Sequence, residues 1–299
     1  MADAGASADR PSQDLVPSGD SRSDGAVGRR DAVEGDDDAL SGCLEPRDVI
    51  PAGAVCVHSV RGTVTALDGL ALAGRLITLC GPACFFGETS AGGAFSVEPE
   101  DLLNLARYSV TAHGRPDFAT LNVPTEPAVD GTSALREAMR LPRYTDRGPP
   151  IPDGVRGGTV TAGDVTVTIA PGTRIDPDIE DAELGELGTL LRTVRVPLES
   201  APRLAREAGL ADVYALGPFN LTTNTPMALR LRNRAMLPAG TRVEFLGLSY
   251  RIVDPPFDAG HWVVMARGVV SPDGAEVRTN DTEGLTVLTW VGYRALRSP

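Results

Sequence analysis

The chain has 299 residues, with 28 basic and 40 acidic side chains and a formal net charge of −12. The acidic balance argues against a nucleic-acid-binding protein, because neutralising phosphates requires clustered basic side chains. No apolar run approaches the roughly 18–20 residues that cross a bilayer, so no membrane span is predicted. The 33 glycines and 24 prolines interrupt the chain at short intervals, which argues against long helices.

Residues 1–48 are predicted to form a disordered acidic tail. This segment carries 12 acidic residues against 5 arginines. Its few large apolar residues cannot offset a backbone ordering cost of about 1–2 kcal/mol per residue. The run Asp36–Asp38 is interpreted as solvated acidic sequence rather than as a cation site.

The start of the chain shows no signal peptide, because neither basic residues nor an apolar stretch follow Met1. Leu40-Ser41-Gly42-Cys43 matches a lipobox, the motif in which the cysteine becomes lipidated. The acidic residues 34–38 before it are the opposite of the apolar segment that export requires, so a lipid anchor is not expected. A tail of this composition would suit a stalk behind a removed signal peptide.

The four cysteines lie within one short stretch, between residues 43 and 84. An even number in one module indicates two disulfides and an oxidising, extracytoplasmic compartment. The segment Gly81-Pro82-Ala83 is a plausible turn that would place Cys80 and Cys84 opposite each other. The predicted pairs are therefore Cys80–Cys84 and Cys43–Cys56.

Two other states of the cysteines remain open. Four free thiols in a cytosolic protein are one of them. The other is a zinc site built from Cys56, His58, Cys80 and Cys84, although their spacing matches no common structural zinc motif.

Short strands between turns are predicted from residue 54 onward, because the chain is rich in β-branched and apolar residues with glycine at the borders. One helical turn is expected at 100–106, after Pro99. The strands of this first series are expected at 54–65, 75–80, 85–90, 94–97 and 108–113.

Residues 125–154 are predicted to be a proline-rich linker between two domains. Within the linker, residues 134–141 are expected to form a short helix that Pro142 ends.

The second series of strands predicts another β domain at 155–299. Ser271-Pro272-Asp273-Gly274 indicates a turn in which Gly274 takes a positive φ, and residues 203–208 are expected to be helical. The pattern predicts an all-β chain, with sandwich modules at 49–124 and 155–299. Strands are expected at 159–161, 165–169, 190–196, 213–216, 227–231, 241–248, 251–253, 262–270, 275–279 and 285–293.

In the first module, expected strands alternate with turns that contain glycine. It runs from Gly62-Thr63-Val64 through a glycine-bounded turn at 68–74 to Gly92-Gly93-Ala94-Phe95, and it ends in Tyr108-Ser109-Val110-Thr111-Ala112. This order resembles the carboxypeptidase regulatory-like domain, a transthyretin-like β-sandwich of secreted and surface proteins. The resemblance departs from the family at Ala71, where proline is usual, and it covers about residues 55–124.

The second module opens with Gly157-Gly158-Thr159-Val160, continues to Ile169-Ala170-Pro171-Gly172, and later carries Gly217-Pro218-Phe219. These elements resemble the ZU-type β-sandwich of ankyrins, zonula occludens proteins and netrin receptors, which also occurs in bacterial surface proteins. Some relatives cleave themselves at His-Phe-Ser, and that tripeptide is absent, so autoproteolysis is not expected. Both resemblances imply non-catalytic extracytoplasmic modules.

No catalytic residue and no cofactor are predicted. The three histidines, His58, His113 and His261, lack the spacing of zinc peptidase ligands. The sequence also lacks a nucleophile elbow, a phosphate-binding loop and a dinucleotide-binding fingerprint.

One acidic run has a spacing that calcium ligands use. Its carboxylates alternate along a loop, although the glycine and the terminal glutamate of an EF-hand loop are missing. A solvated acidic loop is therefore favoured over a calcium site. The candidate ligands are Asp176, Asp178, Glu180 and Asp181.

Two functions from different classes follow from this organisation. The first is a structural or interaction protein of a bacterial envelope or surface, which binds a protein or glycan partner through its β modules. The exclusive use of arginine as the basic residue favours a GC-rich bacterial genome. The second is a carbohydrate-binding or accessory module of a hydrolase, which would need an exposed indole at Trp262 or Trp290.

Overall fold

The computed structural model describes residue 43, residues 52–250 and residues 258–296. The predicted tail at 1–48 lies outside the described residues except for Cys43, and so does the strand expected at 251–253. All of these described residues belong to one compact unit. Short strands dominate the described chain, which confirms the all-β prediction. Among the described residues, no helix has the length and apolarity needed to cross a membrane.

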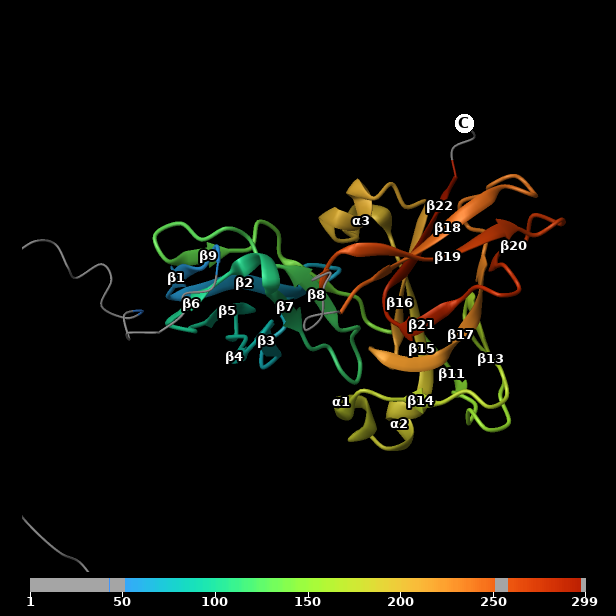
Figure 1. Ribbon diagram of the computed structural model, residues 1–299, viewed down its shortest axis with the longest axis horizontal. Helices are drawn as coiled ribbons and strands as arrows, with labels where there is room; N and C mark the ends of the chain where they lie inside the picture. Colours follow the sequence, from blue (N-terminus) through green and yellow to red (C-terminus); the bar gives the residue numbers. More distant parts are fainter. Residues whose placement is uncertain (1–42, 44–51, 251–257, 297–299) are drawn as a thin grey trace, which may run out of the picture. The chain divides into compact units, whose positions relative to one another are not determined.

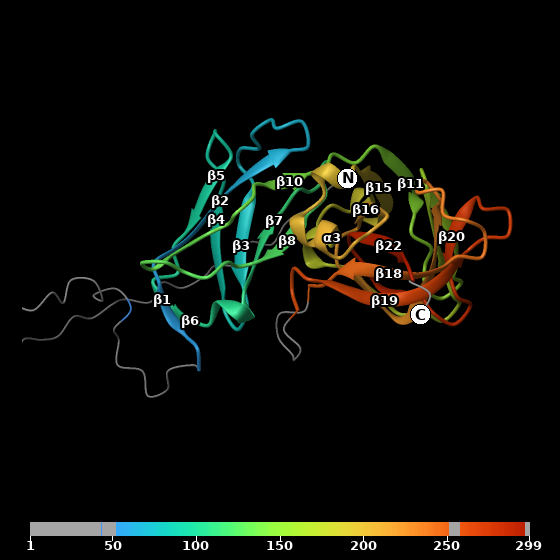
Figure 2. The same cartoon turned by 90° about the horizontal axis from the view of Figure 1, so that it is seen from above.

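We call residues 52–145 the first lobe (Figure 1). Two four-stranded sheets form it, one with the order β10-β2-β5 and with β9 also on β2, the other with the order β4-β3-β7-β8. Figure 2 labels strands of both sheets, β2, β5 and β10 of the first and β3, β4, β7 and β8 of the second. β1 pairs with β6 in a separate two-stranded sheet. The strands are β1 (Val55–Val57), β2 (Ser59–Ala66), β3 (Leu76–Cys80), β4 (Cys84–Glu88), β5 (Ala94–Val97), β6 (Asp101–Leu103), β7 (Ser109–Ala112), β8 (Leu121–Pro124), β9 (Thr132–Ala134) and β10 (Met139–Leu141).

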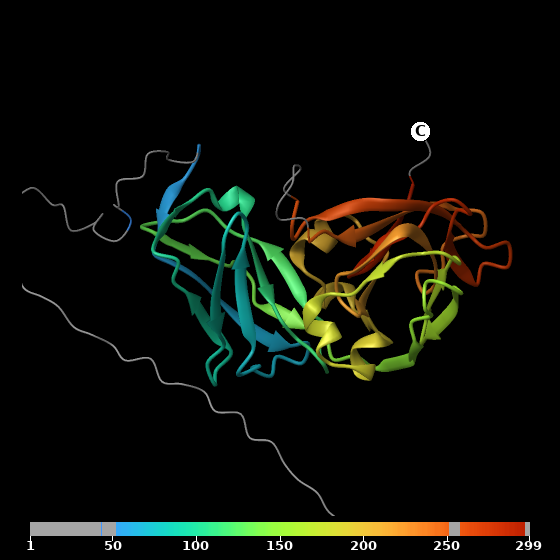
Figure 3. The ribbon, with the colours of Figure 1, turned by 60° about the horizontal axis from the view of Figure 1, so that its bottom comes forward.

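The second lobe, residues 146–296, is built on one long antiparallel sheet that curves around its own interior (Figure 3). The strand order is β11-β15-β16-β22-β18-β19-β20-β17-β13-β12, and β14 and β21 add to β17. The two end strands meet, because Gly148 of β11 lies against Thr161 of β12. The strands are β11 (Asp146–Pro150), β12 (Gly158–Ala162), β13 (Val165–Ile169), β14 (Ile175–Asp176), β15 (Leu190–Val196), β16 (Asp212–Gly217), β17 (Leu221–Arg232), β18 (Arg242–Leu248), β19 (Trp262–Val270), β20 (Glu276–Thr279), β21 (Leu285–Leu288) and β22 (Val291–Ala295).

Three short helices interrupt the strands of the second lobe: α1 (Ile179–Ala182), α2 (Glu186–Thr189) and α3 (Arg203–Glu207). α3 is the helix expected at 203–208, whereas α1 and α2 were not predicted. Asp178 caps α1, since its side chain accepts a hydrogen bond from the Glu180 backbone N–H.

Apolar side chains gather in two cores. One fills the interior of the second lobe, around Phe245 and Tyr293. The other continues from the first lobe into the second and includes Val110, Tyr144 and Trp290. The Trp290 indole Nε1 donates a hydrogen bond to the Thr120 carbonyl across the lobes at 2.7 Å. The two lobes therefore share one of their cores.

Two glycine turns from the sequence analysis have the geometry that their sequence requires. Gly93 has φ +77°, and a Cβ there would lie 2.4 Å from the Val64 carbonyl oxygen. Gly274 has φ +72°, as expected, and its N–H donates to the Ser271 carbonyl at 2.9 Å. Both positions favour glycine because a side chain is strained at positive φ.

The helix expected at 134–141 is not formed. β9 and β10 occupy this segment instead, and both pair in parallel with β2. Between them, the Leu135 N–H donates to the Arg61 carbonyl at 2.9 Å. Pairing with a distant strand therefore overrides the local helical preference. The helical turn expected at 100–106 is also displaced, since β6 comes first and a 3-10 turn follows at Leu105–Arg107.

Candidate functional site

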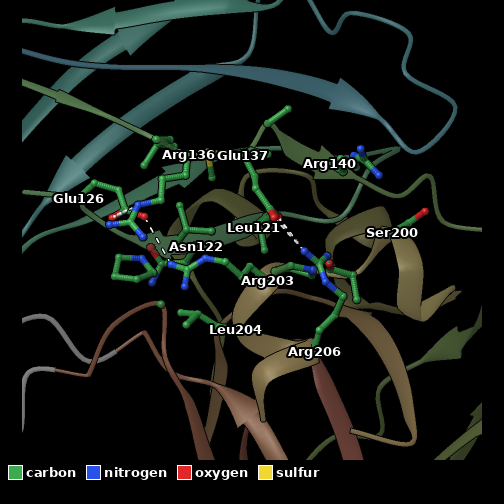
Figure 4. Close-up of a pocket in the computed structure, with 18 of the residues that line it drawn as sticks. Leu121, Asn122, Glu126, Arg136, Glu137, Arg140, Ser200, Arg203, Leu204 and Arg206 are labelled. Carbon is green, nitrogen blue, oxygen red and sulfur yellow. Dashed lines mark hydrogen bonds and ion pairs between the residues drawn. The ribbon is translucent and has the colours of Figure 1, made fainter. Parts of the chain in front are cut away.

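A groove of about 290 Å³ opens between the first lobe and α3 (Figure 4). Leu121, Met139, Ala201 and Leu204 supply apolar lining. Charged side chains also line it, four arginines against three glutamates. These charged residues are Arg136, Arg140, Arg203, Arg206, Glu126, Glu137 and Glu199.

Ion pairs hold most of these charged side chains in place. Glu126 pairs with Arg136 at 3.0 Å and with Arg203 at 3.4 Å, so one carboxylate joins the 135–138 loop to α3. Glu137 accepts two hydrogen bonds from Arg206, at 2.8 and 3.2 Å. Because each guanidinium carries five N–H donors, these pairs leave donors free for a ligand.

Local structure explains why these arginines meet. Pro202 precedes α3 with the fixed φ that a helix start requires. One turn later, Glu207 pairs with Arg203 at 2.8 Å. On the other wall, the 135–138 loop leaves the sheet between β9 and β10 and carries Arg136 and Glu137. Arg140 follows in β10 and makes no ion pair with any residue that the structure describes.

A second group of charges lies where the lobes meet, with Asp181 and Arg192 buried and the other members partly exposed. We call Arg115, Asp178, Glu180, Asp181 and Arg192 the charge cluster. Asp181 is fully buried and accepts from Arg192 at 2.6 Å and from Arg115 at 3.1 Å. Its carboxylate also accepts the Phe219 backbone N–H at 2.9 Å. Three donors therefore compensate the burial of this single carboxylate.

Arg192 is nearly as buried as its partner, with a side chain 1% exposed. Its Nη1 donates to the Pro116 carbonyl at 2.8 Å, and its guanidinium carbon lies 5.1 Å from the centre of the Tyr144 ring. Burial raises the pKa of Tyr144, so its hydroxyl stays protonated and donates to the Leu216 carbonyl at 3.3 Å. The cation is thus held by a carboxylate, a carbonyl and an aromatic face.

His113 lies beside the charge cluster in its neutral form. Its Nδ1–H donates to Glu180 at 2.7 Å, and its Nε2 lies 3.2 Å from the Thr78 hydroxyl, from which it accepts. Burial, with a smaller contribution from the Arg115 charge, lowers the pKa of His113 from 6.5 to about 4. Arg115 also pairs with Glu180, which reduces the ability of that carboxylate to stabilise an imidazolium.

The lowered pKa of His113 predicts that the protein loses stability in mild acid. Between pH 6.5 and pH 4 the unfolded chain binds a proton on His113 that the native chain excludes, so the free energy of unfolding falls with falling pH. The His113 contribution to this fall is about 3 kcal/mol at or below pH 4. Denaturant unfolding at several pH values should show that His113→Gln removes this part of the pH dependence.

The matched control is His261→Gln, since His261 is exposed. It should leave the pH dependence unchanged. A His113→Gln variant with the same pH dependence as the unaltered chain would contradict a buried neutral imidazole.

The acidic run is not the solvated loop favoured from the sequence, since Asp181 is buried, and arginines engage the carboxylates that were considered as calcium ligands. Asp178 and Glu180 pair with Arg115, and Asp176 pairs with Arg174 at 2.9 Å. Asp181 is occupied by two arginines, as described above. Among the described residues, these four carboxylates do not converge within ligand distance of one point. Arginine guanidinium groups occupy the places where a cation would bind.

Both cysteine pairs are those expected from the sequence. Cys43 is bonded to Cys56, and Cys80 is bonded to Cys84 across the β3–β4 turn. No cysteine among the described residues is free, so the four free thiols considered from the sequence are not present. The zinc site considered at Cys56, His58, Cys80 and Cys84 is not formed either, because all four cysteine sulfurs are bonded in disulfides.

The indoles do not form an exposed platform for sugars. Trp290 is fully buried in the shared core. Trp262 is partly buried and packs against the same core, with its Nε1 enclosed. The aromatic feature that would favour a carbohydrate-binding module is therefore missing at both tryptophans.

The sequence did not predict Arg115 or Arg192 as site residues. It also did not predict the groove between the first lobe and α3, which we call the arginine groove. One signal was present for Arg192. It shares a strand face with Val194 and Val196, which are buried, so an arginine there indicates a buried ion pair. The groove carries no such signal, because α3 and the 135–138 loop are brought together only by the tertiary fold.

Comparisons of the chain with protein families, with curated proteins and with solved structures find no match.

Proposed function

We propose that this protein is an extracytoplasmic structural or interaction protein of a bacterial envelope or surface, which acts by binding a partner rather than by turning over a substrate. The two disulfides and the all-β fold are compatible with an extracytoplasmic protein. We also propose that residues 49–124 form a carboxypeptidase regulatory-like domain and that residues 155–299 form a ZU-type domain. In their support, the motif residues Phe95 and Tyr108 are both buried in the first lobe's core.

The arginine groove is the observation that carries the binding function. Its apolar lining offers area to bury, and its four arginines exceed its three glutamates. Arg140 is exposed and has no described ion-pair partner, and the side chain of Arg136 is 65% exposed. A carboxylate of a bound segment can therefore pair with these two arginines without displacing a buried contact. We propose an acidic segment of a partner protein as the occupant.

Binding of a labelled decaglutamate peptide to the full chain tests this proposal. Exchanging Arg136 and Arg140 together for glutamate should weaken binding at least tenfold, because it replaces two attractive charges with two repulsive ones. Fluorescence anisotropy at two salt concentrations measures the affinity, which should fall with added salt.

Arg156→Glu provides the control, since Arg156 is an exposed arginine that does not line the groove and whose partner is Asp153. It should bind the peptide like the unaltered chain. Equal affinities for the groove variant and this control would show that the groove is not the binding surface.

A further inference from the structure

The Cys43–Cys56 disulfide has a histidine beside one of its sulfurs. The Cys56 Sγ lies 3.7 Å from His58 Nε2, and His58 Nδ1 lies 2.7 Å from the Glu100 carboxylate. In the described part of the chain, no other cysteine sulfur lies within hydrogen-bond distance of a histidine. A sulfur, an imidazole and a carboxylate in this order form the arrangement that activates a thiol.

The surrounding backbone holds the imidazole in this position. The His58 ring packs on Gly131, where an added Cβ would lie 2.2 Å from the ring. The Gly131 carbonyl accepts the His58 backbone N–H at 2.8 Å. Glu100 has φ +46°, a conformation that is costly for a glutamate, and this residue carries the carboxylate that orients the ring. A glycine and a strained residue therefore fix the histidine against the disulfide.

The two sulfurs differ in accessibility. Cys56 is partly exposed, whereas Cys43 is 6% exposed. Because exchange rates depend on access to the attacked sulfur, we infer that an incoming thiol attacks at the more exposed Cys56 and that the buried Cys43 resolves the resulting bond.

We propose that Cys43–Cys56 is a thiol–disulfide exchange site, with Cys56 as the reacting sulfur, Cys43 as the resolving sulfur, His58 as the group that stabilises the Cys56 thiolate, and Glu100 as a positioning residue. The co-reactant is a dithiol or its disulfide. This goes beyond the proposed binding function and uses none of the groove residues.

The exchange is balanced as follows. One thiolate of the dithiol attacks the Cys56 sulfur, the Cys43–Cys56 bond breaks, and the Cys43 sulfur leaves with the electron pair and takes a proton from water. The second thiolate of the dithiol then attacks its partner sulfur in the mixed disulfide. Cys56 leaves with the electron pair, and the proton that balances its charge comes from water and is shared between the Cys56 sulfur and the facing His58 Nε2. Two electrons and two protons pass from the dithiol to the protein, and the reverse sequence oxidises the protein.

Alkylation of the reduced full chain tests the site. The chain is reduced with dithiothreitol, and the rate of iodoacetamide modification of each cysteine is followed by mass spectrometry from pH 5 to pH 10. Cys56 should react with a midpoint well below the ordinary thiol value of about 8.5. His58→Gln should move that midpoint back toward the ordinary value and slow the reaction at pH 6 by about tenfold.

Three controls accompany the measurement. His261→Gln changes an exposed histidine of the second lobe, and Glu98→Gln removes an exposed carboxylate two residues before Glu100 whose hydrogen-bond partner is Ser96; both should leave the Cys56 midpoint unaltered. Cys80 and Cys84 in the same molecule report any general effect of the substitutions, and their rates should not change. Glu100→Gln should shift the Cys56 midpoint in the same direction as His58→Gln by a smaller amount, which a purely structural role for Glu100 would not do.

An ordinary midpoint for Cys56 in the unaltered chain would overturn the proposal. The same holds if His58→Gln and Glu100→Gln both leave the midpoint where it was. Should His58→Gln fail to fold, the Cys56 midpoint of the unaltered chain and the Glu100→Gln shift decide the outcome.

Discussion

Replacing Asp181 with alanine should lower the free energy of unfolding by about 3–5 kcal/mol, the cost of breaking a buried ion pair from one side. The remaining Arg192 would keep its charge in a site where its side chain is 1% exposed. The Phe219 N–H and one Arg115 donor would lose their acceptor as well. An unpaired cation and unpaired donors in the interior are among the few changes that cost this much.

Denaturant unfolding of the full chain measures this loss. The matched control is Asp176→Ala, because Asp176 belongs to the same acidic run but is 54% exposed. Its removal should change the free energy of unfolding by no more than about 1 kcal/mol. A second substitution, Arg192→Met, should recover part of the stability of the Asp181→Ala chain by removing the stranded charge. Equal losses for Asp181→Ala and Asp176→Ala would show that the charge cluster is not buried.

Trp290→Ala should cost a similar amount, about 3–5 kcal/mol, because it removes the largest fully buried side chain of the shared core. The Thr120 carbonyl would also lose the indole donor. Since Trp290 belongs to the second lobe and Thr120 to the first, the cavity should destabilise both lobes at once. Trp262→Ala, a change at a partly buried indole, should cost less.

The cooperativity of unfolding tests the same interface. A Trp262→Phe chain has Trp290 as its single tryptophan. Its fluorescence transition should coincide with the transition followed by far-ultraviolet circular dichroism. Two separated transitions would contradict a core shared by the lobes.

The all-β class was predictable because its signals are local. The strand expected at 227–231 lies within β17, where Met227, Leu229 and Leu231 are buried and Arg230 and Arg232 are exposed. The Cys80–Cys84 pair was also predictable, since its partners flank one tight turn. In each case the residues that decide the structure lie within a few positions of one another.

The failures share the opposite property. The segment 134–141 has a helical composition, but its backbone pairs with β2, more than 70 residues earlier in the chain. The run 176–181 was interpreted as a solvated acidic loop, but Arg115 and Arg192 reach Asp181 from other elements and bury its carboxylate. The spacing of residues along the chain shows which side chains could act together. The tertiary fold determines which group, a cation or an arginine, lies against them.

β10 is the last strand of the first lobe in the sequence, directly before the second lobe, and it pairs with β2 at the edge of the first sheet. Dividing the chain in the loop between β9 and β10 would therefore separate β10 from β2. The C-terminal piece would then carry an edge strand that the sheet of the N-terminal piece lacks. The shared core around Trp290 would add apolar surface to that recognition. This loop is thus a rational point at which to split the protein into halves that reassemble, as in a complementation reporter.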